Sequence, residues 1–396
     1  MDTLREAPHG STGAARVFRF FLPEIICGWG ALAEAGRTSR RLGARRVLVV
    51  TEPESVQSGW IAELHHDLQQ AGLEPVTWDA VSPTPRDHEV VAALQVYRAQ
   101  DCDVIIGMGG RAAMDTAKAV AVLASNGGSV ADYDGFDRVT APTPPTLMIP
   151  TTIGSGAEIL QSCAIHDTSR RRMVTMLGCA LVPDACLVDP RLISTLSPEL
   201  VAACGVEAIA MAIEGYLSRT VTAMNEPHAL TALRLISNHL VQAVDAPGGQ
   251  EEMTALATAG VHAAVAFSNT LHSTTAALSG LLAALLGVHR GAVRGVLLPH
   301  AIRSPIDACA DRYRAVADAV GLDTTGASGE WAAHAVADWM RALGDKVGIP
   351  AGLSELGVGP DTADRIALGA TCGIDRRSGH ETASFEYAST LLRAAL

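Results

Sequence analysis

The first half of the chain alternates short, continuously apolar runs with segments of helical spacing. "RRVLVVTE" (Arg45–Glu52), "CDVIIGMGG" (Cys102–Gly110) and "PTLMIPTT" (Pro145–Thr152) are such runs, and helix-like stretches follow the first two. Apolar runs without polar alternation are typical of strands buried on both faces, which occur in parallel sheets with helical crossovers. We therefore predict an α/β domain with a parallel sheet over residues 1–192.

From about Ser197 the pattern becomes helical. Four long segments have helical spacing, with Gly and Pro concentrated between them; they are residues 197–219, 226–244, 251–287 and 328–348. Strand signals stop near residue 190. We therefore predict an all-α domain over residues 193–396, with the active site in the cleft between the two domains.

The composition narrows the class of protein. The formal net charge is −12 and there is no block of Lys or Arg, which argues against nucleic acid and anionic membranes as partners. The N-terminus has no apolar stretch of signal-peptide length, and the eight cysteines include no CxxC pair. We expect a cytoplasmic protein with reduced cysteines that acts on a small molecule. We also expect a homodimer.

Two glycine-rich segments follow predicted strands. "GMGGRAAMDTAK" (Gly107–Lys118) leads from a strand into a helix, a setting in which glycine lets backbone N–H groups approach a phosphate. A plain tight turn explains the same residues equally well. In "IPTTIGSGAE" (Ile149–Glu158), the hydroxyls of Thr151, Thr152 and Ser155 are candidates to bind a cofactor. A local hydroxyl-bonded turn is the alternative.

Glu52 ends the first apolar run and is a candidate for cofactor selection. A carboxylate after such a strand can accept hydrogen bonds from an adenosine ribose and repels a 2′-phosphate. This favours NAD over NADP. An exposed glutamate with no role in binding is the alternative.

Four motifs in order resemble the iron-containing (group III) alcohol dehydrogenase family, which includes the maleylacetate reductases. Gly109–Lys118 is similar to the family pattern GGGSxxDxAK and Pro150–Glu158 to PTTxGTGSE; a segment like Arg171–Gly205 follows, and Gly205–Tyr216 is similar to GxDAxxHAxEGY. The resemblance implies the dehydroquinate synthase-like fold of that family, with a dinucleotide-binding domain and a helical domain. It also implies NAD-binding residues, which are Glu52, Gly109, Gly110, Arg111, Asp115, Lys118, Thr151, Thr152, Gly154 and Ser155.

The resemblance further implies that this chain departs from the family at the metal site. The family holds its metal with one Asp and three His, and the matching positions here are Glu207, Met211, Ala276 and Arg290. A thioether suits Fe²⁺ or Zn²⁺ poorly beside oxygen ligands, alanine has no ligand atom, and arginine is a permanent cation. A further family histidine matches Gly280. We therefore expect no metal.

Arginine at this position offers a substitute for the metal. The guanidinium of Arg290 can donate hydrogen bonds to a developing alkoxide or to a substrate carboxylate, with Glu207 balancing its charge. A purely structural ion pair between the two is the alternative. His289 is a candidate proton donor or acceptor. His272 is a further candidate, and Glu207, His272 and His289 form an alternative set of three metal ligands.

These observations together predict a metal-independent, NAD(P)-dependent oxidoreductase suited to specialised metabolism. It would move hydride to or from a small molecule with an activated carbonyl, iminium or conjugated carbonyl, which needs less help from a Lewis acid. A non-redox lyase or cyclase and a non-catalytic binding protein on the same fold are the alternatives. Arg111 and Ala112 replace the family's Gly and Ser, so Arg111 either contacts the pyrophosphate or crowds it.

Overall fold

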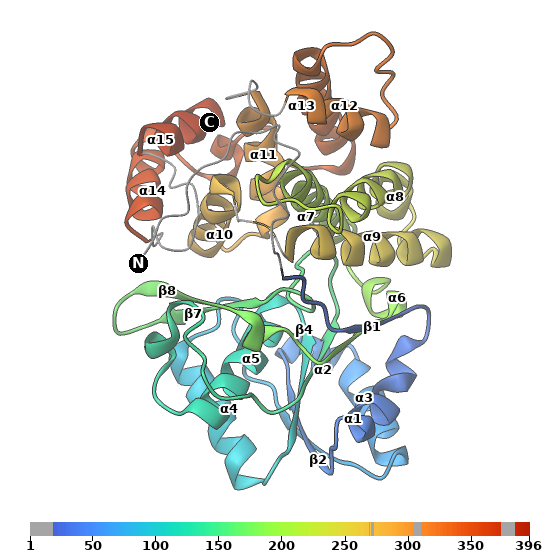
Figure 1. Ribbon diagram of the computed structural model, residues 1–396, viewed down its shortest axis with the longest axis vertical. Helices are drawn as coiled ribbons and strands as arrows, with labels where there is room; N and C mark the ends of the chain where they lie inside the picture. The colour runs from blue at the N-terminus through green and yellow to red at the C-terminus, as the bar shows by residue number, and fades with distance from the viewer. Residues whose placement is uncertain (1–18, 269, 271–272, 304–309, 374–384) are drawn as a thin grey trace.

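A six-stranded sheet forms the centre of the amino-terminal half of the computed structural model, and every strand is parallel to its neighbours (Figure 1). The structure describes residues 19–268, 270, 273–303, 310–373 and 385–396. In the order in which they pair, the strands are β1 (Glu24–Cys27), β9 (Ala185–Val188), β6 (Thr146–Pro150), β4 (Val104–Gly109), β2 (Arg46–Val50) and β3 (Glu74–Trp78). The predicted parallel sheet is confirmed, and β2, β4 and β6 are the three apolar runs.

Helices cover both faces of this sheet. They are η1 (Ala31–Glu34), α1 (Ala35–Arg41), α2 (Pro53–Gln57), α3 (Trp60–Gln70), α4 (Asp87–Ala99) and α5 (Arg111–Asn126). Val47 and Val49 of β2 belong to a core cluster with α1 and α3, whereas Leu48 and Val50 belong to a second cluster with α4 and α5. Successive side chains of a strand point to opposite faces, so an unbroken apolar run supplies both cores.

A second, three-stranded sheet adjoins α5. It consists of β5 (Gly135–Phe136), β8 (Arg172–Leu177) and β7 (Ser162–Asp167), in that order, with short helical turns η2 (Val130–Tyr133) and η3 (Cys179–Leu181) nearby. β7 and β8 form an antiparallel hairpin, visible at the left of Figure 1. The apolar-run pattern did not predict this hairpin, because both of its strands alternate between buried and more exposed residues.

The carboxyl-terminal half is helical, as predicted. Its elements are α7 (Pro198–Leu217), α8 (Glu226–Asp245), α9 (Gln250–Ser268), α10 (Thr274–Leu286), α11 (Arg290–Arg303), α12 (Ala310–Ala319), α13 (Gly329–Val347), η4 (Leu353–Leu356), α14 (Pro360–Gly373) and α15 (Phe385–Ala394). Residues 251–287, predicted as one helical segment, form two helices instead. Ser273 starts the second one, because its hydroxyl accepts a hydrogen bond from the N–H of Ala276 at 3.0 Å.

Helix α7 is the core helix of this half. It is long and apolar enough to cross a membrane by length and composition, but 89% of its apolar stretch is buried inside the protein. A short helix, α6 (Pro190–Ile193), connects β9 to α7. The predicted division between residues 192 and 193 falls within α6 and stays a prediction.

Candidate functional site

Helices α7 and α11 cross in backbone contact at Gly291. A Cβ atom at this position would overlap the carbonyl oxygen of Ala203 and lie 3.2 Å from Cβ of Glu207. Only glycine therefore permits the two helices to approach this closely. The crossing places the first two turns of α11, which carry Arg290 and Arg294, beside Glu207 in the middle of α7.

Arg294, rather than Arg290, is the main partner of Glu207. Its Nη1 donates to Glu207 Oε1 at 2.7 Å and its Nη2 donates to Glu214, whereas Nη2 of Arg290 approaches Glu207 Oε1 only to 4.0 Å. Burial raises the pKa of Glu207, but Arg294 and Arg290 outweigh burial and hold this pKa below its ordinary value. The predicted pair of Glu207 and Arg290 is thus the outer contact of a network centred on Arg294.

Our sequence reasoning missed Arg294 and Glu214. The signal was present in helical spacing, since Glu214 lies two turns after Glu207 on an apolar helix and Arg294 lies one turn after Arg290. Carboxylates two turns apart on a buried face require a cation between them, because unpaired buried charges are costly. Arg294 is 1% exposed and supplies that cation.

The guanidinium of Arg290 lies against α10. Its Nη2 donates to the carbonyl oxygen of Ala276 at 3.2 Å, and its Nε lies 3.9 Å from where a Cβ of Gly280 would be. These small residues stand at the two positions that match family histidines, so α10 leaves room for a side chain from α11. Nε of Arg290 is buried without a hydrogen-bond partner. Burial lowers the pKa of Arg290 to about 10, so the group stays protonated at neutral pH.

Among the described residues, the donor atoms around Glu207 are a poor set for a metal ion. Met211 packs under the loop that follows β6, with its Cε 2.7 Å from where a Cβ of Gly156 would be. The Glu207 carboxylate is bound to one arginine and flanked by another, beside this thioether, which is a poor donor set for Fe²⁺ or Zn²⁺. Within the described part of the chain, no group of three or more His, Cys, Asp or Glu side chains is arranged to hold a metal.

His289 precedes Arg290 and faces α7. Its Nδ1 accepts a hydrogen bond from the N–H of Gly291 at 3.1 Å, and its Nε2 lies 3.7 Å from Sγ of Cys204. Burial lowers the pKa of His289, so the ring is neutral at pH 7, and the bond to Nδ1 places its proton on Nε2. His272 lies outside the described residues.

Glu52 closes over the glycine loop at the end of β4. Its Oε1 accepts a hydrogen bond from the N–H of Gly110 at 2.6 Å, and a Cβ on Gly109 would lie 2.5–2.6 Å from its carboxylate atoms. Burial raises the pKa of Glu52 to about 7, although the bond from Gly110 lowers it. Oε2 is buried without a partner. Oε2 is therefore an acceptor without a partner, which fits the predicted contact with a ribose hydroxyl. The N–H of Gly110 is already bonded to Oε1.

Arg111 leaves the glycine loop and reaches the loop after β6. It donates to the carbonyl oxygen of Ser155, and its Nη1 lies 3.9 Å from Oδ2 of Asp115. The Ser155 hydroxyl bonds within its own turn, to the N–H of Ala157 at 3.3 Å and to Glu158 at 3.4 Å. The hydroxyl of Ser155 therefore makes the hydrogen bonds of a local turn, which was the alternative to its binding a cofactor.

The remaining residues of the predicted cofactor site connect the loop after β4 with the loop after β6, and the loop after β6 with α7. The N–H of Thr151 donates to the carbonyl oxygen of Gly109 at 2.9 Å, and Thr152 is partly exposed beside it. Gly154 has a φ of +73°, and a Cβ there would lie 2.5 Å from the carbonyl oxygen of Cys204 on α7. The loop after β6 thus rests directly on the helix that carries Glu207.

Asp115 and Lys118 lie beneath the glycine loop, at 1% and 2% exposure. Oδ2 of Asp115 accepts from the N–H of Ala164 at 3.2 Å, and Nζ of Lys118 donates to the carbonyl oxygens of Leu160 and Ser162 at 2.5 and 3.2 Å. Burial lowers the pKa of Lys118 to about 8. These contacts fasten β7 to α5, so the two residues support the loop from below.

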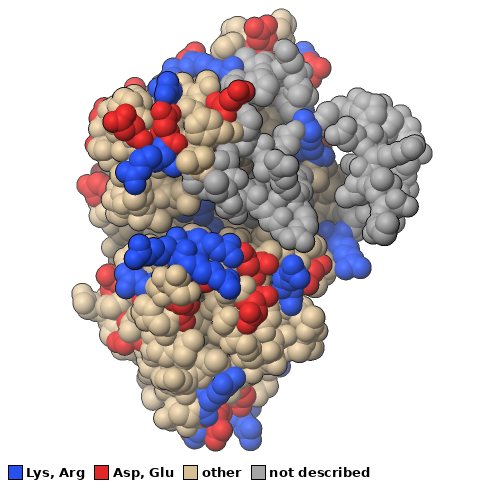
Figure 2. All heavy atoms as spheres, turned by 90° about the vertical axis from the view of Figure 1, so that its left-hand side faces the viewer, with Lys and Arg blue, Asp and Glu red and all other residues tan. Residues whose placement is uncertain are grey.

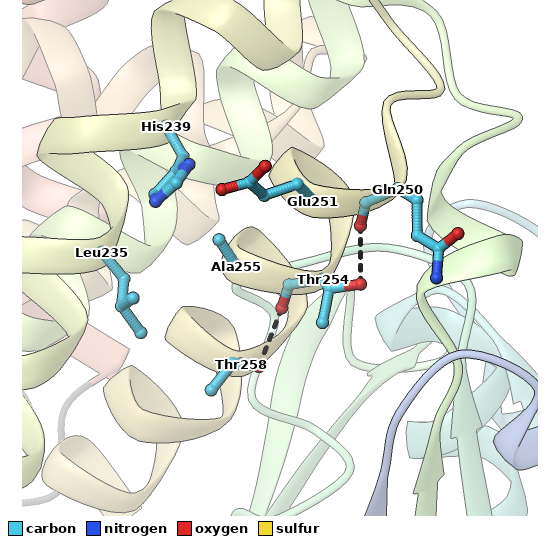
Figure 3. A pocket seen from close by; sticks show the side chains of 7 residues that line it. All are labelled: Leu235, His239, Gln250, Glu251, Thr254, Ala255 and Thr258. Atoms are coloured by element: carbon cyan, nitrogen blue, oxygen red, sulfur yellow. Dashed lines mark hydrogen bonds between the residues drawn. The ribbon is translucent and has the colours of Figure 1, made fainter.

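A pocket of about 570 Å³ lies elsewhere, between α8 and α9 (Figure 3). Its lining consists of Leu235, His239, Gln250, Glu251, Thr254, Ala255 and Thr258, and Figure 3 shows His239 and Glu251 side by side across it. None of the predicted site residues lines this pocket. The arginine–glutamate network and the two glycine-containing loops therefore form the candidate site.

Basic side chains gather at mid-height on the face shown in Figure 2, bordering the furrow between the two halves. The β7–β8 hairpin lies on this side, and its exposed tip carries Arg170, Arg171 and Arg172. Of these, Arg170 contacts Asp167 at 3.7 Å and Arg172 contacts Asp134 at 2.8 Å. A local positive field on a chain of net charge −12 favours the approach of anions.

Comparisons with known proteins match both halves. The model of the iron-containing alcohol dehydrogenases matches residues 23–190, and that of the C-terminal part of the Fe-containing alcohol dehydrogenase family matches residues 201–395. The NAD-dependent methanol dehydrogenase of Bacillus methanolicus is 28% identical over 95% of this chain and 99% of its own length. The lactaldehyde reductase of Escherichia coli (strain K12) is 30% identical, over 87% and 90% respectively.

The fold is also that of solved structures. A crystal structure of a 1,3-propanediol oxidoreductase superposes with a TM-score of 0.92 and 28% identity, covering 96% of this chain and all of the other. An alcohol dehydrogenase from Oenococcus oeni superposes with a TM-score of 0.91 and 25% identity. The likeness therefore extends over the α/β half, the helical half and their arrangement.

Proposed function

This chain belongs to the iron-containing alcohol dehydrogenase family, and we propose that it is an NAD-dependent oxidoreductase in which arginine replaces the catalytic metal. One observation carries the proposal. Glu207, at a position that matches a metal ligand, is bound by Arg294 at 2.7 Å with Arg290 at 4.0 Å. The permanent positive charge of a guanidinium can stabilise the negative charge that develops on a carbonyl oxygen during reduction.

The loops after β4 and β6 are proposed to hold the cofactor. Gly109 and Gly110 lie at the start of α5, where a helix N-terminus favours a pyrophosphate, and the Glu52 carboxylate lies against both glycines. Oε2 of Glu52 has no partner and is the proposed acceptor for a ribose hydroxyl. Thr152 is available beside the loop after β6. When bound, the nicotinamide would supply or accept the hydride. Glu52 would repel the 2′-phosphate of NADP, so NAD is the expected cofactor.

The protein's own groups have separate roles in this proposal. Arg294 neutralises Glu207 and Glu214 in the interior, so both of its Nη atoms are occupied, and its Nε is buried without a partner. The side chain of Arg290 is 27% exposed and its contact with Glu207 is as long as 4.0 Å, so its guanidinium can receive charge from a substrate. His289 is neutral and carries its proton on Nε2, which makes it a hydrogen-bond donor whose catalytic use remains a prediction.

The proposed substrate is a small molecule with an activated carbonyl, iminium or conjugated carbonyl. Such groups need less polarisation than an unactivated ketone, which matches a site that offers guanidinium groups in place of a Lewis acid. The non-redox and non-catalytic alternatives differ from this proposal in one observable, since only the oxidoreductase exchanges hydride with NAD. The homodimer and the cytoplasmic location remain predictions.

Elemental analysis and kinetics on one preparation test the proposal. The protein is purified without chelator, and the oxidation of NADH is followed with a panel of aldehydes and keto acids before and after dialysis against EDTA. We expect well below one Fe or Zn per chain and a rate that EDTA does not change. Close to one metal per chain, with activity lost on removal and restored by Fe²⁺ or Zn²⁺, would refute metal independence.

A further inference from the structure

We propose that the substrate carries a permanent anionic group, such as a carboxylate, which Arg290 and Arg111 hold from the two halves of the protein. The inference rests on the proposed function, because it names the substrate class of the same site. Arg111 was predicted only as a contact of the cofactor pyrophosphate, and the proposal adds the anionic group of the substrate as a second binding partner. Arg290 would act as the residue that selects anionic over neutral carbonyl compounds.

Neither arginine has a carboxylate within hydrogen-bonding distance among the described residues. The nearest carboxylate oxygen lies 3.9 Å from Arg111, on Asp115, and 4.0 Å from Arg290, on Glu207. Each guanidinium is instead bonded to a backbone carbonyl, that of Ser155 for Arg111 and that of Ala276 for Arg290. A backbone carbonyl orients a guanidinium without neutralising it, so both side chains retain the ability to bind an anion.

Both arginines also occupy unfavourable positions in their helices. Arg111 is the first residue of α5 and Arg290 is the first residue of α11, and neither helix has an acidic residue in its first turn. The positive end of a helix dipole disfavours a cation and favours an anion, by about 0.3–1 kcal/mol for each charge. A bound anion at the start of either helix would therefore offset this unfavourable interaction.

The two guanidinium groups lie beside the same stretch of α7. Arg111 donates to Ser155, whose neighbours Gly154 and Gly156 pack against Cys204 and Met211 of α7, and Arg290 lies 4.0 Å from Glu207 on that helix. Burial lowers the pKa of Arg290, and repulsion from Arg111 and Arg294 lowers it further, while Glu207 opposes the shift. Arg111 also acts on the pKa of Glu207 and of His289, although it belongs to the other half of the chain. Glu207 is already bound to Arg294. A transient alkoxide supplies one negative charge, whereas two arginines whose contacts with Asp115 and Glu207 are as long as 3.9 and 4.0 Å fit a substrate with an additional, permanent one.

The partial exposure of both groups makes them accessible. Arg290 and Arg111 are 27% and 25% exposed, whereas Arg294 is 1% exposed. On the outside, the basic band in Figure 2 borders the furrow between the two halves and would attract an anion toward it. An anionic substrate thus meets a positive field at the surface and two further positive groups inside.

Calorimetric titration with unreactive ligands tests the inference without hydride transfer. Oxamate carries a carboxylate and oxamide, its neutral amide, does not; each is titrated into the protein with and without NADH. We expect oxamate to bind at least about 10- to 100-fold more tightly than oxamide, as for a charge-assisted hydrogen bond. Arg290→Gln and Arg111→Gln should each weaken oxamate alone. Arg303→Gln is the matched control, because Arg303 lies on the same helix at the same 27% exposure but pairs with Asp338.

The outcomes separate this inference from the proposed function. Arg290-dependent binding of oxamate supports the anionic subsite even where no hydride transfer is detected, in which case the proposed function fails alone. Equal affinity for oxamate and oxamide in a protein that reduces neutral aldehydes overturns the subsite and leaves the proposed function standing. An Arg290→Gln protein that loses affinity for NADH but not for oxamate assigns this residue to the cofactor pyrophosphate and also overturns the inference.

Discussion

Arg294 and Arg290 lie one turn apart on α11 and approach the same oxygen of Glu207, at 2.7 Å and 4.0 Å. This difference in distance distinguishes a closely paired arginine from one whose charge is only loosely paired. Arg294 is bound on both sides by Glu207 and Glu214 and is buried, whereas Arg290 donates to the backbone carbonyl of Ala276 and its side chain is 27% exposed. Arg294 therefore contributes to the stability of the fold, whereas the guanidinium of Arg290 is available to bind a substrate.

Replacing each arginine by methionine should separate these roles in the free energy of unfolding. Arg294→Met leaves two buried carboxylates without a partner, which should cost about 3–5 kcal/mol. Arg290→Met removes a contact of 4.0 Å and a hydrogen bond to the carbonyl oxygen of Ala276, and should cost only about 1–2 kcal/mol. Urea denaturation at pH 7 measures both. Adding Glu207→Gln and Glu214→Gln to Arg294→Met should restore much of the loss, and equal costs for the two single variants would contradict the division.

Substitution of Arg290 should change the rate of turnover much more than it changes the stability of the fold. Arg290→Lys keeps the charge but loses the planar fork, so it should retain part of the activity. Arg290→Ala should lower the rate roughly 10²–10³-fold, the typical cost of losing one preorganised donor to a developing charge. Melting temperature and turnover are measured on the same variants. A folded Arg290→Ala protein with near-normal turnover would show that this arginine has no catalytic role.

Gly291→Ala should damage the site more than Gly295→Ala on the same helix. A methyl group at 291 meets the backbone oxygen of Ala203, which cannot turn aside, so α11 must move away from α7. At 295 it meets only side-chain atoms of Ile349 and Val206, at 2.9 and 3.0 Å. We expect a cost of about 1–3 kcal/mol or more for the first variant and less for the second. Equal stabilities and activities would show that the crossing tolerates a Cβ.

Glu52 should make the stability depend on pH. Burial raises its pKa from 4.5 to about 7, so folding favours the protonated form. The stabilisation from protonated Glu52 is complete below about pH 4.5 and is lost as the pH rises through 7. The free energy of unfolding of the wild type relative to Glu52→Gln should therefore fall across this range, by about 1.4 kcal/mol for each pH unit between the two pKa values. A difference that stays constant from pH 4.5 to 8 would exclude a raised pKa.

The cofactor preference should also depend on Glu52. Its carboxylate lies at the glycine loop and would repel the 2′-phosphate of NADP, so NADH should bind more tightly than NADPH. Glu52→Ala should narrow the difference between the two. Calorimetric titration with both cofactors measures it. Equal affinities in the wild type, or a preference for NADPH that Glu52→Ala leaves unchanged, would contradict the assignment.

The sequence was sufficient for the parts of the fold that follow from simple periodicity. Unbroken apolar runs predicted the parallel strands β2, β4 and β6, because each run supplies both cores, and long helical spacing predicted the second half. The β7–β8 hairpin was not predicted, because its strands alternate between buried and more exposed residues instead of being apolar throughout. In the site, Glu207 and Arg290 were predicted together, but the shorter distance belongs to Arg294. Which of two arginines one turn apart reaches a carboxylate depends on the crossing at Gly291, a tertiary contact that no local pattern encodes.

The network on α7 and α11 has a consequence for how a working site is assembled. An ion held by ligands is present only in part of a population, in proportion to its supply and its rate of dissociation. A guanidinium bound to the main chain by covalent bonds is present in every molecule from the moment of translation. If arginine replaces the metal as proposed, no molecule of this protein can lack the positive group of its active site. Neither chelators nor a change in iron supply would alter the number of active sites.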